Sequence, residues 1–350
     1  MEFQAESLVV GNFQIRYYGI IIVAAMLVAA TVAAGLAKRR GLDPDHVWGG
    51  LTWAIFPGIV LARLWFVLFP PISLTAGCGN PGSTMLCMDT AWFFENFFNL
   101  NNGAIAIWSG GLSIFGAVLG GFLGAWLYVS PLHNRVARIF WMIFYPLTLV
   151  LTFVSWLPVG LWKRLRGNPE VFKLPTFTTD FPEQGLAFAP WLDIAAVALP
   201  LAQFIGRWAN YVNQELYGLP TNLPWGITID VDKRVGEFAS PIEYPADTLF
   251  HPLFLYEALW NLLAFFVLLN LYNRFRSRFL EGDFFLLYLM QYSFIRFLLE
   301  FLRVEVAYLP GTTINSSQTM TLVVFGVALL AFWWRGRGGA RNLTAAESAA

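Results

Sequence analysis

The sequence contains few charged residues and carries no net charge. Asp, Glu, Lys and Arg make up 13% of its 350 residues, against about 25% in a typical soluble protein. Its 22 basic and 22 acidic residues balance, so the chain lacks the positive surface that binds nucleic acid. Hydrophobic residues make up 57% and include 33 Phe and 15 Trp, too many for soluble cores to bury. The composition predicts a multi-pass membrane protein with no nucleic-acid partner.

Cysteine and basic N-terminal residues are also scarce. The two cysteines, Cys78 and Cys87, are spaced too far apart for the paired-cysteine motifs that bind metals. We expect no metal and no cofactor. The first fourteen residues contain Glu2 and Glu6 but no basic residue, whereas a secretory signal peptide begins with positive charge. We therefore expect the start of this sequence to be mature protein.

Long apolar runs predict membrane-spanning helices, each of which needs about 20 residues. A further run at 139–162 contains Pro146 and Pro158, and proline interrupts helices. We expect this run to be re-entrant or to lie along the interface, with an eighth crossing as the alternative. The prediction is an all-α integral membrane protein with seven transmembrane helices, at 15–37, 47–69, 105–129, 191–209, 251–272, 284–303 and 318–334.

Basic residues between the runs predict the orientation, because cytoplasmic loops are rich in Lys and Arg. Basic clusters follow the first, third, fifth and last runs and precede the fourth. All of them fall on one side if seven helices begin outside. The sequence therefore predicts an outer N-terminus and a cytoplasmic C-terminus.

The predicted organisation is a single membrane domain over residues 1–334. Its outer loops are 70–104 and 211–250, and the second is strand-like enough to suggest a small periplasmic head. Both cysteines lie in the first loop, where oxidising conditions permit a disulfide, although two free thiols remain an alternative. Residues 131–190 form an insertion, and 335–350 a disordered cytoplasmic tail.

Ionisable residues within the sixth run predict a functional site, because a charge at bilayer depth costs about 2.5–3.5 kcal/mol. Tyr292, Arg296 and Glu300 recur every four residues and Arg303 follows three later, which places all four on one helical face. An Arg296–Glu300 pair that only clamps helices is the structural alternative. One carboxylate cannot neutralise two arginines, however, so the face favours a bound anion such as a phosphate.

Three other segments carry candidate polar sites. Arg207 and Asn210 close the fourth run and either bind a phosphodiester or cap a helix at the interface. His251 opens the fifth run as a cap or as a group that titrates near neutral pH. Gly110 and Gly111 precede glycines at four-residue steps, which favour close helix packing and leave room for a headgroup.

These segments together resemble the prolipoprotein diacylglyceryl transferase family. The resemblance runs in order over nearly the whole chain, and Asp193 also matches a family aspartate. Residues 206–218 read GRWANYVNQELYG, similar to GRxGNFxNxELYG; 251–257 read HPLFLYE, similar to HPxQLYE; 292–303 read YSFIRFLLEFLR, similar to the run Tyr-x3-Arg-Phe-x2-Glu-Phe-x-Arg; 17–19 read YYG, similar to WYG; and 110–116 read GGLSIFG, similar to GGxxxHG.

The resemblance implies transfer of the diacylglyceryl group from phosphatidylglycerol to the lipobox cysteine of a prolipoprotein, with release of glycerol phosphate. The implied partners are phosphatidylglycerol, the prolipoprotein signal peptide and membrane lipids, in the plasma (inner) membrane of a bacterium. Catalytic roles are implied for Arg207, Tyr292 and Arg296. Substrate binding is implied for Tyr18, Gly19, Gly110, Gly111, Arg207, Asn210, Glu215, Gly218, Glu300 and Arg303.

One departure from the family bears on the mechanism. The histidine of GGxxxHG, which serves as the base for the thiol, is Phe115 here, and a phenylalanine cannot accept a proton. Nearby arginines lower the pKa of a thiol, so we expect an active enzyme that depends mainly on electrostatics around Arg207 and Arg296. His251 or Glu215 is the candidate substitute base. Further departures are Trp208-Ala209 and the 131–190 insertion.

Two other functions remain compatible with these residues. A catalytically degenerate relative would bind phosphatidylglycerol or signal peptides through the same arginines, and Phe115 favours it. A lipid transporter would need a polar stripe across the whole bilayer. Here the polar residues, including Arg63 in the second run, gather toward the outer half.

Overall fold

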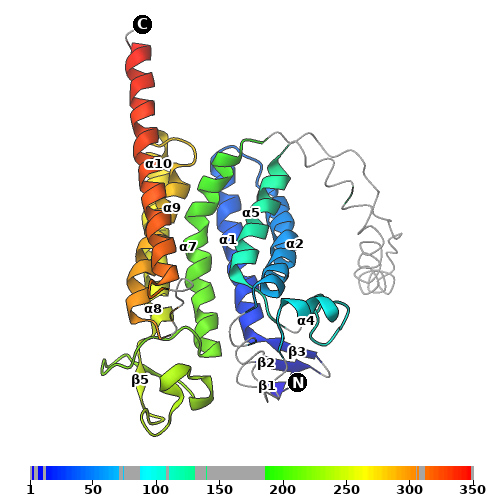
Figure 1. The fold of residues 1–350 in the computed structure, drawn as a ribbon. Helices are drawn as coiled ribbons and strands as arrows, with labels where there is room; N and C mark the ends of the chain where they lie inside the picture. Colours follow the sequence, from blue (N-terminus) through cyan, green and yellow to red (C-terminus); the bar gives the residue numbers. More distant parts are fainter. Residues whose placement is uncertain are drawn as a thin grey trace, which may run out of the picture. The chain divides into compact units, whose positions relative to one another are not determined.

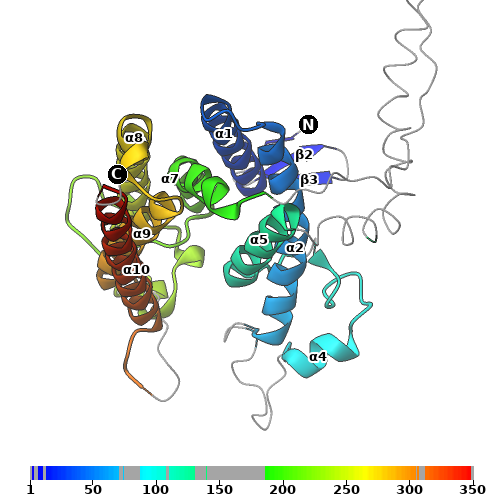
Figure 2. The same cartoon turned by 90° about the horizontal axis from the view of Figure 1, so that it is seen from above.

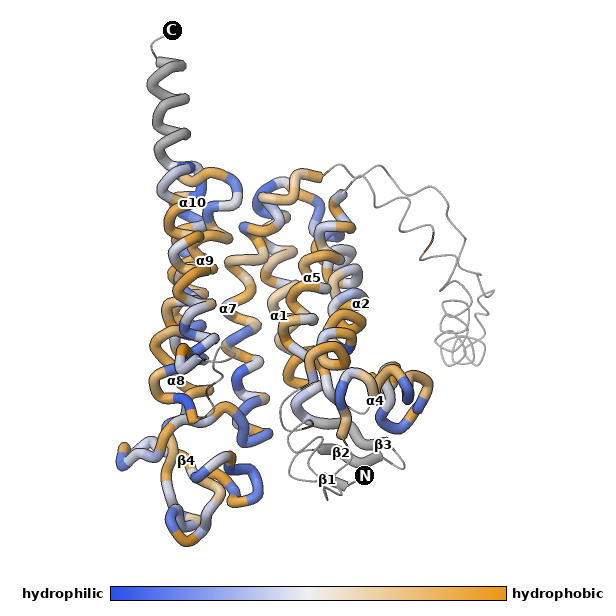
Figure 3. The backbone as a smooth tube through the Cα atoms, in the orientation of Figure 1, coloured by the Kyte–Doolittle hydropathy of each residue, from blue (hydrophilic) through white to orange (hydrophobic). Residues whose placement is uncertain are grey.

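Six helices of the computed structural model are long and apolar enough to cross a membrane, within the residues that the structure describes (2–3, 7–10, 13–70, 74, 87–107, 110–130, 139, 186–304, 306 and 312–347). Figure 3 shows them as mainly hydrophobic, and large apolar side chains such as Val60, Leu263 and Leu330 are exposed, as expected of lipid-facing surfaces. The chain is a multi-pass helical membrane protein. The helices are α1 (Tyr17–Arg39), α2 (Asp45–Leu68), α7 (Phe188–Asn213), α8 (Leu253–Phe275), α9 (Asp283–Leu299) and α10 (Ser316–Glu347).

These helices match six of the seven expected spans. The remaining span, expected at 105–129, contains α5 (Ile114–Val129), whose 16 residues fall short of the roughly 20 that a crossing needs. The expected start of this helix was wrong, because Gly110 and Gly111 adopt positive φ angles of 90° and 68° that a helix does not accommodate. The run at 139–162 lies outside the described residues, apart from residue 139.

The chain divides into two compact units, each described here by itself (Figures 1 and 2). The first unit is Met1–Val47 with Ala189–Ala350, and the second is Trp48–Phe188. Helices α8, α9 and α10 of the first unit lie side by side in both views. The core of this unit is built from small residues of α1 and larger side chains of the other helices, among them Ala33, Ala37, Ile194, Val197, Leu268 and Phe284.

The side chain of Asp193 in α7 binds the backbone at the start of α9 and so links these two helices of the first unit. Its carboxylate accepts hydrogen bonds from the amides of Gly282 (2.8 Å) and Phe285 (3.2 Å). These amides belong to the first turn of α9 or precede it, where helical amides have no partner in their own helix. Asp193 therefore caps α9 from a neighbouring helix, which gives the residue a structural role.

Glycines of α5 allow two helices of the second unit to touch at their backbones. A Cβ atom added at Gly116, Gly120 or Gly124 would clash with backbone atoms of α2, beginning with the carbonyl oxygens of Leu61, Pro57 and Trp53. All three glycines are buried. The packing expected from the four-residue glycine spacing is therefore present, and α2 is the partner helix.

Arg63 of α2 binds backbone carbonyl groups within the second unit. It is 5% exposed and donates to the carbonyls of Ala104 (2.9 Å), Gly110 (2.7 Å) and Gly111 (3.1 Å), as well as Gly103. These acceptors lie in the two segments that lead into α5. Arg63 was expected only as one of the polar residues gathered toward the outer half, and its guanidinium is occupied by these backbone carbonyl oxygens.

A small head follows α7, as the sequence predicted. Strands β4 (Ile227–Thr228) and β5 (Leu249–Phe250) pair antiparallel, and two 3₁₀ turns, η2 (Val231–Lys233) and η3 (Gly236–Ala239), lie between them. Arg234 is buried and donates to the carbonyls of Ile229, Tyr244, Pro245 and Ala246. The head is thus held by one arginine and a small aromatic core that includes Tyr217, Phe238 and Phe250.

Two other features differ from the expectations. The N-terminal residues form a three-stranded antiparallel sheet that we did not predict, comprising β1 (Glu2–Phe3), β2 (Ser7–Val10) and β3 (Phe13–Arg16). Helix α10 continues to Glu347, across residues expected to be disordered. This stretch has three Ala and three Arg, which favour helix, alongside three Gly, which do not.

The loop predicted at 70–104 is described in part. A short helix, α4 (Thr90–Glu95), begins at Asp89, whose side chain accepts from the amide of Trp92 (2.8 Å). Cys87 is disulfide-bonded, which agrees with the disulfide alternative, while Cys78 lies outside the described residues.

Candidate functional site

Three arginines and two buried glutamates of the first unit form one network, here called the arginine cluster. Arg207 lies in the last two turns of α7, and Glu257 lies early in α8. Arg296 lies in the last turn of α9, Glu300 begins the 3₁₀ turn η5 (Glu300–Leu302), and Arg303 follows it. The side chains of Glu257 and Glu300 are 3% and 0% exposed. Arg207 and the predicted residues of α9 and η5 therefore meet, and Glu257 of α8 joins them.

Glu257 is the centre of this network. One carboxylate oxygen accepts a hydrogen bond from Arg207, and the other lies 3.5 Å from Arg296. Glu300 lies 3.4 Å from Arg296 and 3.6 Å from Arg303. Two glutamates thus form ion pairs with three arginines, so one positive charge has no buried carboxylate to neutralise it. Such a site attracts an anion, and arginine recognises phosphate oxygens through paired donors.

Polar side chains extend the cluster toward the turn that follows α7. Arg207 donates to the carbonyl oxygen of the Asn210 side chain (3.3 Å) and to the hydroxyl of Tyr292 (3.3 Å). Asn210 in turn donates to Glu215 (2.8 Å). Tyr18 of α1 lies within electrostatic range of Glu215 and Arg207. This arrangement joins five of the predicted site residues through direct or charge interactions.

The turn that carries Glu215 is strained. Gln214 and Leu216 have positive φ angles of 53° and 57°, which are uncommon for residues with a side chain. The head holds this turn in place, because the Gln214 amide donates to the Asp230 side chain (2.7 Å) and accepts from the Asp230 backbone (2.7 Å). Strain of this kind is characteristic of functional sites.

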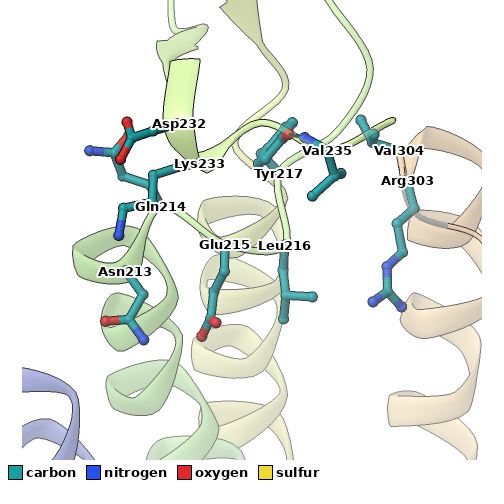
Figure 4. A pocket seen from close by; sticks show the side chains of 10 residues that line it. All are labelled: Asn213, Gln214, Glu215, Leu216, Tyr217, Asp232, Lys233, Val235, Arg303 and Val304. Atoms are coloured by element: carbon teal, nitrogen blue, oxygen red, sulfur yellow. Dashed lines mark hydrogen bonds between the residues drawn. The ribbon is translucent and has the colours of Figure 1, made fainter. Parts of the chain in front are cut away.

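Two cavities adjoin the turn. The larger one, here called the outer pocket because residues of the head line part of it, has a volume of about 380 Å³ (Figure 4). It is lined by Asn213, Gln214, Glu215, Leu216, Tyr217, Asp232, Lys233, Val235, Arg303 and Val304. The inner cavity is only about 10 Å³ and is lined by Arg207, Leu216, Leu253, Phe254, Glu257, Arg296 and Arg303. Leu216 and Arg303 line both.

Other predicted site residues have different surroundings. The imidazole of His251 forms a hydrogen bond with Tyr256 (3.1 Å). Gly218 is required by packing, because an added Cβ would lie 2.7 Å from the Leu302 carbonyl and 2.8 Å from the Cβ of His251. A Cβ at Gly19, by contrast, would meet no atom within 4 Å. The substrate-binding roles of the two glycines and the role of His251 as a base stay predictions.

Gly110, Gly111 and Phe115 belong to the second unit. The carbonyl groups of Gly110 and Gly111 accept hydrogen bonds from Arg63. Binding of a lipid headgroup by these two glycines stays a prediction. Phe115 is 57% exposed, and its ring lies 6.0 Å from that of Trp65. The residue in the place of the family histidine is therefore an accessible aromatic side chain that cannot carry a proton.

Glu257 is the main residue that the sequence interpretation missed. It is the last residue of the segment HPLFLYE and an ionisable group inside an apolar run, and both signals were available. Gln203, which donates to Tyr288 (2.9 Å), was also missed. Among the described residues, no group of His, Cys, Asp and Glu is placed to hold a metal ion.

The fold and the cluster define a multi-pass membrane protein with a buried cationic site beside an outer pocket. The profile of the family "Prolipoprotein diacylglyceryl transferase" matches residues 6–156 and 175–334. The chain belongs to this family.

Individual relatives agree over most of the chain. It is 34% identical over 298 residues to the phosphatidylglycerol–prolipoprotein diacylglyceryl transferase of Chloroflexus aggregans, covering 83% of this chain and 73% of that protein. The protein of the same name from Leifsonia xyli subsp. xyli is 34% identical over 323 residues (91% and 74%). The one from Gloeobacter violaceus is 28% identical over 333 residues (95% and 93%).

Proposed function

We propose that this protein transfers the diacylglyceryl group of phosphatidylglycerol to the thiol of a prolipoprotein lipobox cysteine and releases glycerol phosphate. The observation that carries the proposal is the arginine cluster, whose three arginines face two buried glutamates. The excess positive charge suits the phosphodiester of an anionic lipid. Membership of the family, and the names of the relatives, support the same reaction.

The reaction forms one bond and breaks another. The thiol sulfur attacks the glyceryl carbon next to the phosphate, a C–S bond forms and the C–O bond to the phosphate breaks. The bonding electrons leave with the phosphate oxygen, and the thiol proton passes to a base or to water. Negative charge therefore grows on the leaving phosphate, and Arg207 and Arg296 stabilise it there. Preorganised donors of this kind are usually the largest catalytic contribution.

Glu257 orients the two arginines for this task. Because it binds Arg207 with one oxygen and Arg296 with the other, it fixes the relative position of their guanidinium groups. Its negative charge also reduces the repulsion between the two guanidinium groups before the lipid binds. Tyr292 adds a hydroxyl beside Arg207, and Asn210 adds a carboxamide.

The proton transfer in this chain does not use an imidazole at position 115. Arginines close to a thiol favour the thiolate, so part of the activation is electrostatic. Glu215, which is exposed and bound to Asn210, and His251 are the available substitute bases. Loss of one general base reduces a rate by about 10²–10⁴, which leaves much of the catalytic effect to the arginines.

The proposed topology has seven crossings, with the N-terminus outside and the C-terminus in the cytoplasm of a bacterium. Six helices of sufficient length and the basic clusters support it. The seventh crossing would be completed by residues next to α5. This topology puts the head and the outer pocket on the periplasmic side of the inner membrane, the side on which lipoproteins mature.

Purified protein in lipid vesicles is expected to transfer the diacylglyceryl group to a lipobox peptide. Arg207→Ala should lower the rate by about 10²–10³, because the phosphate loses a paired donor. Arg207→Lys should recover only part of this loss, since lysine is a point charge without the guanidinium fork. Mass spectrometry of the peptide and assay of released glycerol phosphate measure both products.

The matched control is Arg274→Ala, at an exposed position near the end of α8. Its rate should equal that of the unaltered protein. If Arg207→Ala also keeps the full rate, the arginine cluster is not the catalytic centre.

A second candidate function is lipid binding without turnover, which Phe115 favours because it removes the family's base. The same vesicle assay separates the two functions. If the protein binds phosphatidylglycerol but produces neither modified peptide nor glycerol phosphate, its function is lipid binding without turnover.

A further inference from the structure

The outer pocket and the inner cavity meet at two shared residues. Leu216 separates the arginine cluster from the larger pocket, and Arg303 borders both spaces. In Figure 4 the Leu216 and Arg303 side chains point to the same side of the turn, below the head. A small shift of Leu216 would therefore join the two spaces into one passage.

The chemistry of the reaction demands such a passage. One product, the lipid-modified peptide, remains in the membrane. The other carries a phosphomonoester with up to two negative charges, and a charge of this kind does not cross hydrocarbon. It must leave the cluster on the aqueous side, and the outer pocket is the space that borders the cluster there.

The two spaces differ in their balance of charge. The cluster holds three arginines against two buried glutamates. The outer pocket balances Lys233 and Arg303 against Glu215 and Asp232. It therefore holds an anion more weakly than the cluster, as a site of release should. Its volume of about 380 Å³ greatly exceeds that of one water, roughly 30 Å³, and accommodates a three-carbon phosphate.

Leu216 is suited to move. Its φ of 57° is unfavourable for a residue with a Cβ atom, and this strain would be relieved if the backbone left that conformation. The neighbouring Gln214 is fixed to Asp230 of the head by two hydrogen bonds of 2.7 Å. The turn thus has two residues with positive φ, and hydrogen bonds anchor Gln214 to the head.

We propose that the outer pocket is a release site for the phosphomonoester product, and that Leu216 is the partition across which the product leaves the arginine cluster. Arg303 passes the phosphate from one space to the other, and Lys233 receives it in the outer pocket. The proposal rests on the proposed transferase function and assigns the place where its soluble product is bound last.

The test compares the first turnover with steady-state turnover in lipid vesicles. In Leu216→Trp the larger side chain should obstruct the passage, so the steady-state rate falls about tenfold while the first turnover keeps its rate, because release has become limiting. A burst of modified peptide would precede the slow phase. Leu216→Gly, which suits a positive φ and removes the obstructing side chain, should show no burst of modified peptide.

A binding measurement tests the outer pocket without relying on turnover. Equilibrium dialysis with labelled glycerol phosphate is carried out in the Arg207→Ala variant, in which the arginine cluster has lost its excess positive charge. Adding Lys233→Glu to this variant should reduce the affinity about tenfold, since the reversed charge repels the phosphate. The control is Leu219→Trp, which lies on the same outer segment, is 38% exposed and lines neither cavity. It should leave both the burst and the affinity unchanged.

Two results would overturn the proposal. One is an equal fall in the first and later turnovers of Leu216→Trp, which would make Leu216 part of the reacting site. The other is unaltered affinity when Lys233→Glu is added to Arg207→Ala. Absence of any transfer by the unaltered protein would instead count against the proposed function. If Leu216→Trp does not fold, Leu216→Phe serves as the smaller obstruction.

Discussion

Glu257→Ala is expected to destabilise the protein by about 3–5 kcal/mol and to lower transfer by at least about 10². The substitution leaves Arg207 and Arg296 without the carboxylate that joins them, and the side chain of Glu257 is only 3% exposed. Two like charges would then face each other where water screens them poorly. Thermal unfolding in detergent measures the stability, and the vesicle assay measures the rate.

Glu281 provides a matched control. It also pairs with two arginines, Arg40 at 2.7 Å and Arg276 at 3.4 Å, but its side chain is 51% exposed. Exposed ion pairs contribute about 0–1 kcal/mol, so Glu281→Ala should change stability little and activity not at all. Equal effects of the two substitutions would show that burial of Glu257 has no importance. Glu257→Gln should fall between them, because an amide oxygen still accepts from Arg207.

Gly120→Ala is expected to destabilise the second unit by about 1–3 kcal/mol or more. The new methyl group would clash with the carbonyl of Pro57. Backbone atoms cannot rotate away as side chains can, so α5 and α2 must separate along their whole contact. Fewer correctly folded molecules in the membrane, and a lower unfolding temperature, should both follow.

The neighbouring glycine separates packing from helix propensity. A Cβ at Gly121 would approach nothing closer than 3.9 Å, the distance to the Ala54 carbonyl. Gly121→Ala should therefore be neutral or stabilising, by up to about 1 kcal/mol, because alanine favours helix. If Gly120→Ala behaves in the same way, the close contact between α5 and α2 does not contribute to stability.

The membrane spans were predictable because about 20 consecutive apolar residues have few alternatives to a transmembrane helix. The start of α5 was less predictable, since apolar residues precede it as well. There the positive φ angles of Gly110 and Gly111 keep the helix from starting earlier, and the hydropathy of a sequence does not report backbone angles. The N-terminal sheet was missed because short strands carry a weak periodic signal.

The candidate site was predictable along one helix and less so between helices. Helical periodicity placed Tyr292, Arg296, Glu300 and Arg303 on one face. It could not reveal that Glu257 of α8 binds Arg207 and Arg296, because a sequence contains no distance between helices.

The two kinds of buried arginine also could not be told apart from the sequence. Arg63 and Arg207 both interrupt apolar runs. In the structure Arg63 donates to backbone carbonyls, whereas Arg207 pairs with a carboxylate beside a cavity. Which acceptors surround an arginine depends on the fold of distant segments, so this difference required the structure.

The central claim is that this protein is an active transferase without an imidazole at position 115. Complementation tests it most directly: the protein is expressed in bacteria depleted of their own transferase, and growth and lipoprotein mobility are followed. We predict rescue by the unaltered protein, loss of rescue with Arg296→Ala and no improvement with Phe115→His. Rescue by Phe115→His alone, at equal membrane expression, would contradict the claim and identify a lipid-binding relative that lacks its base.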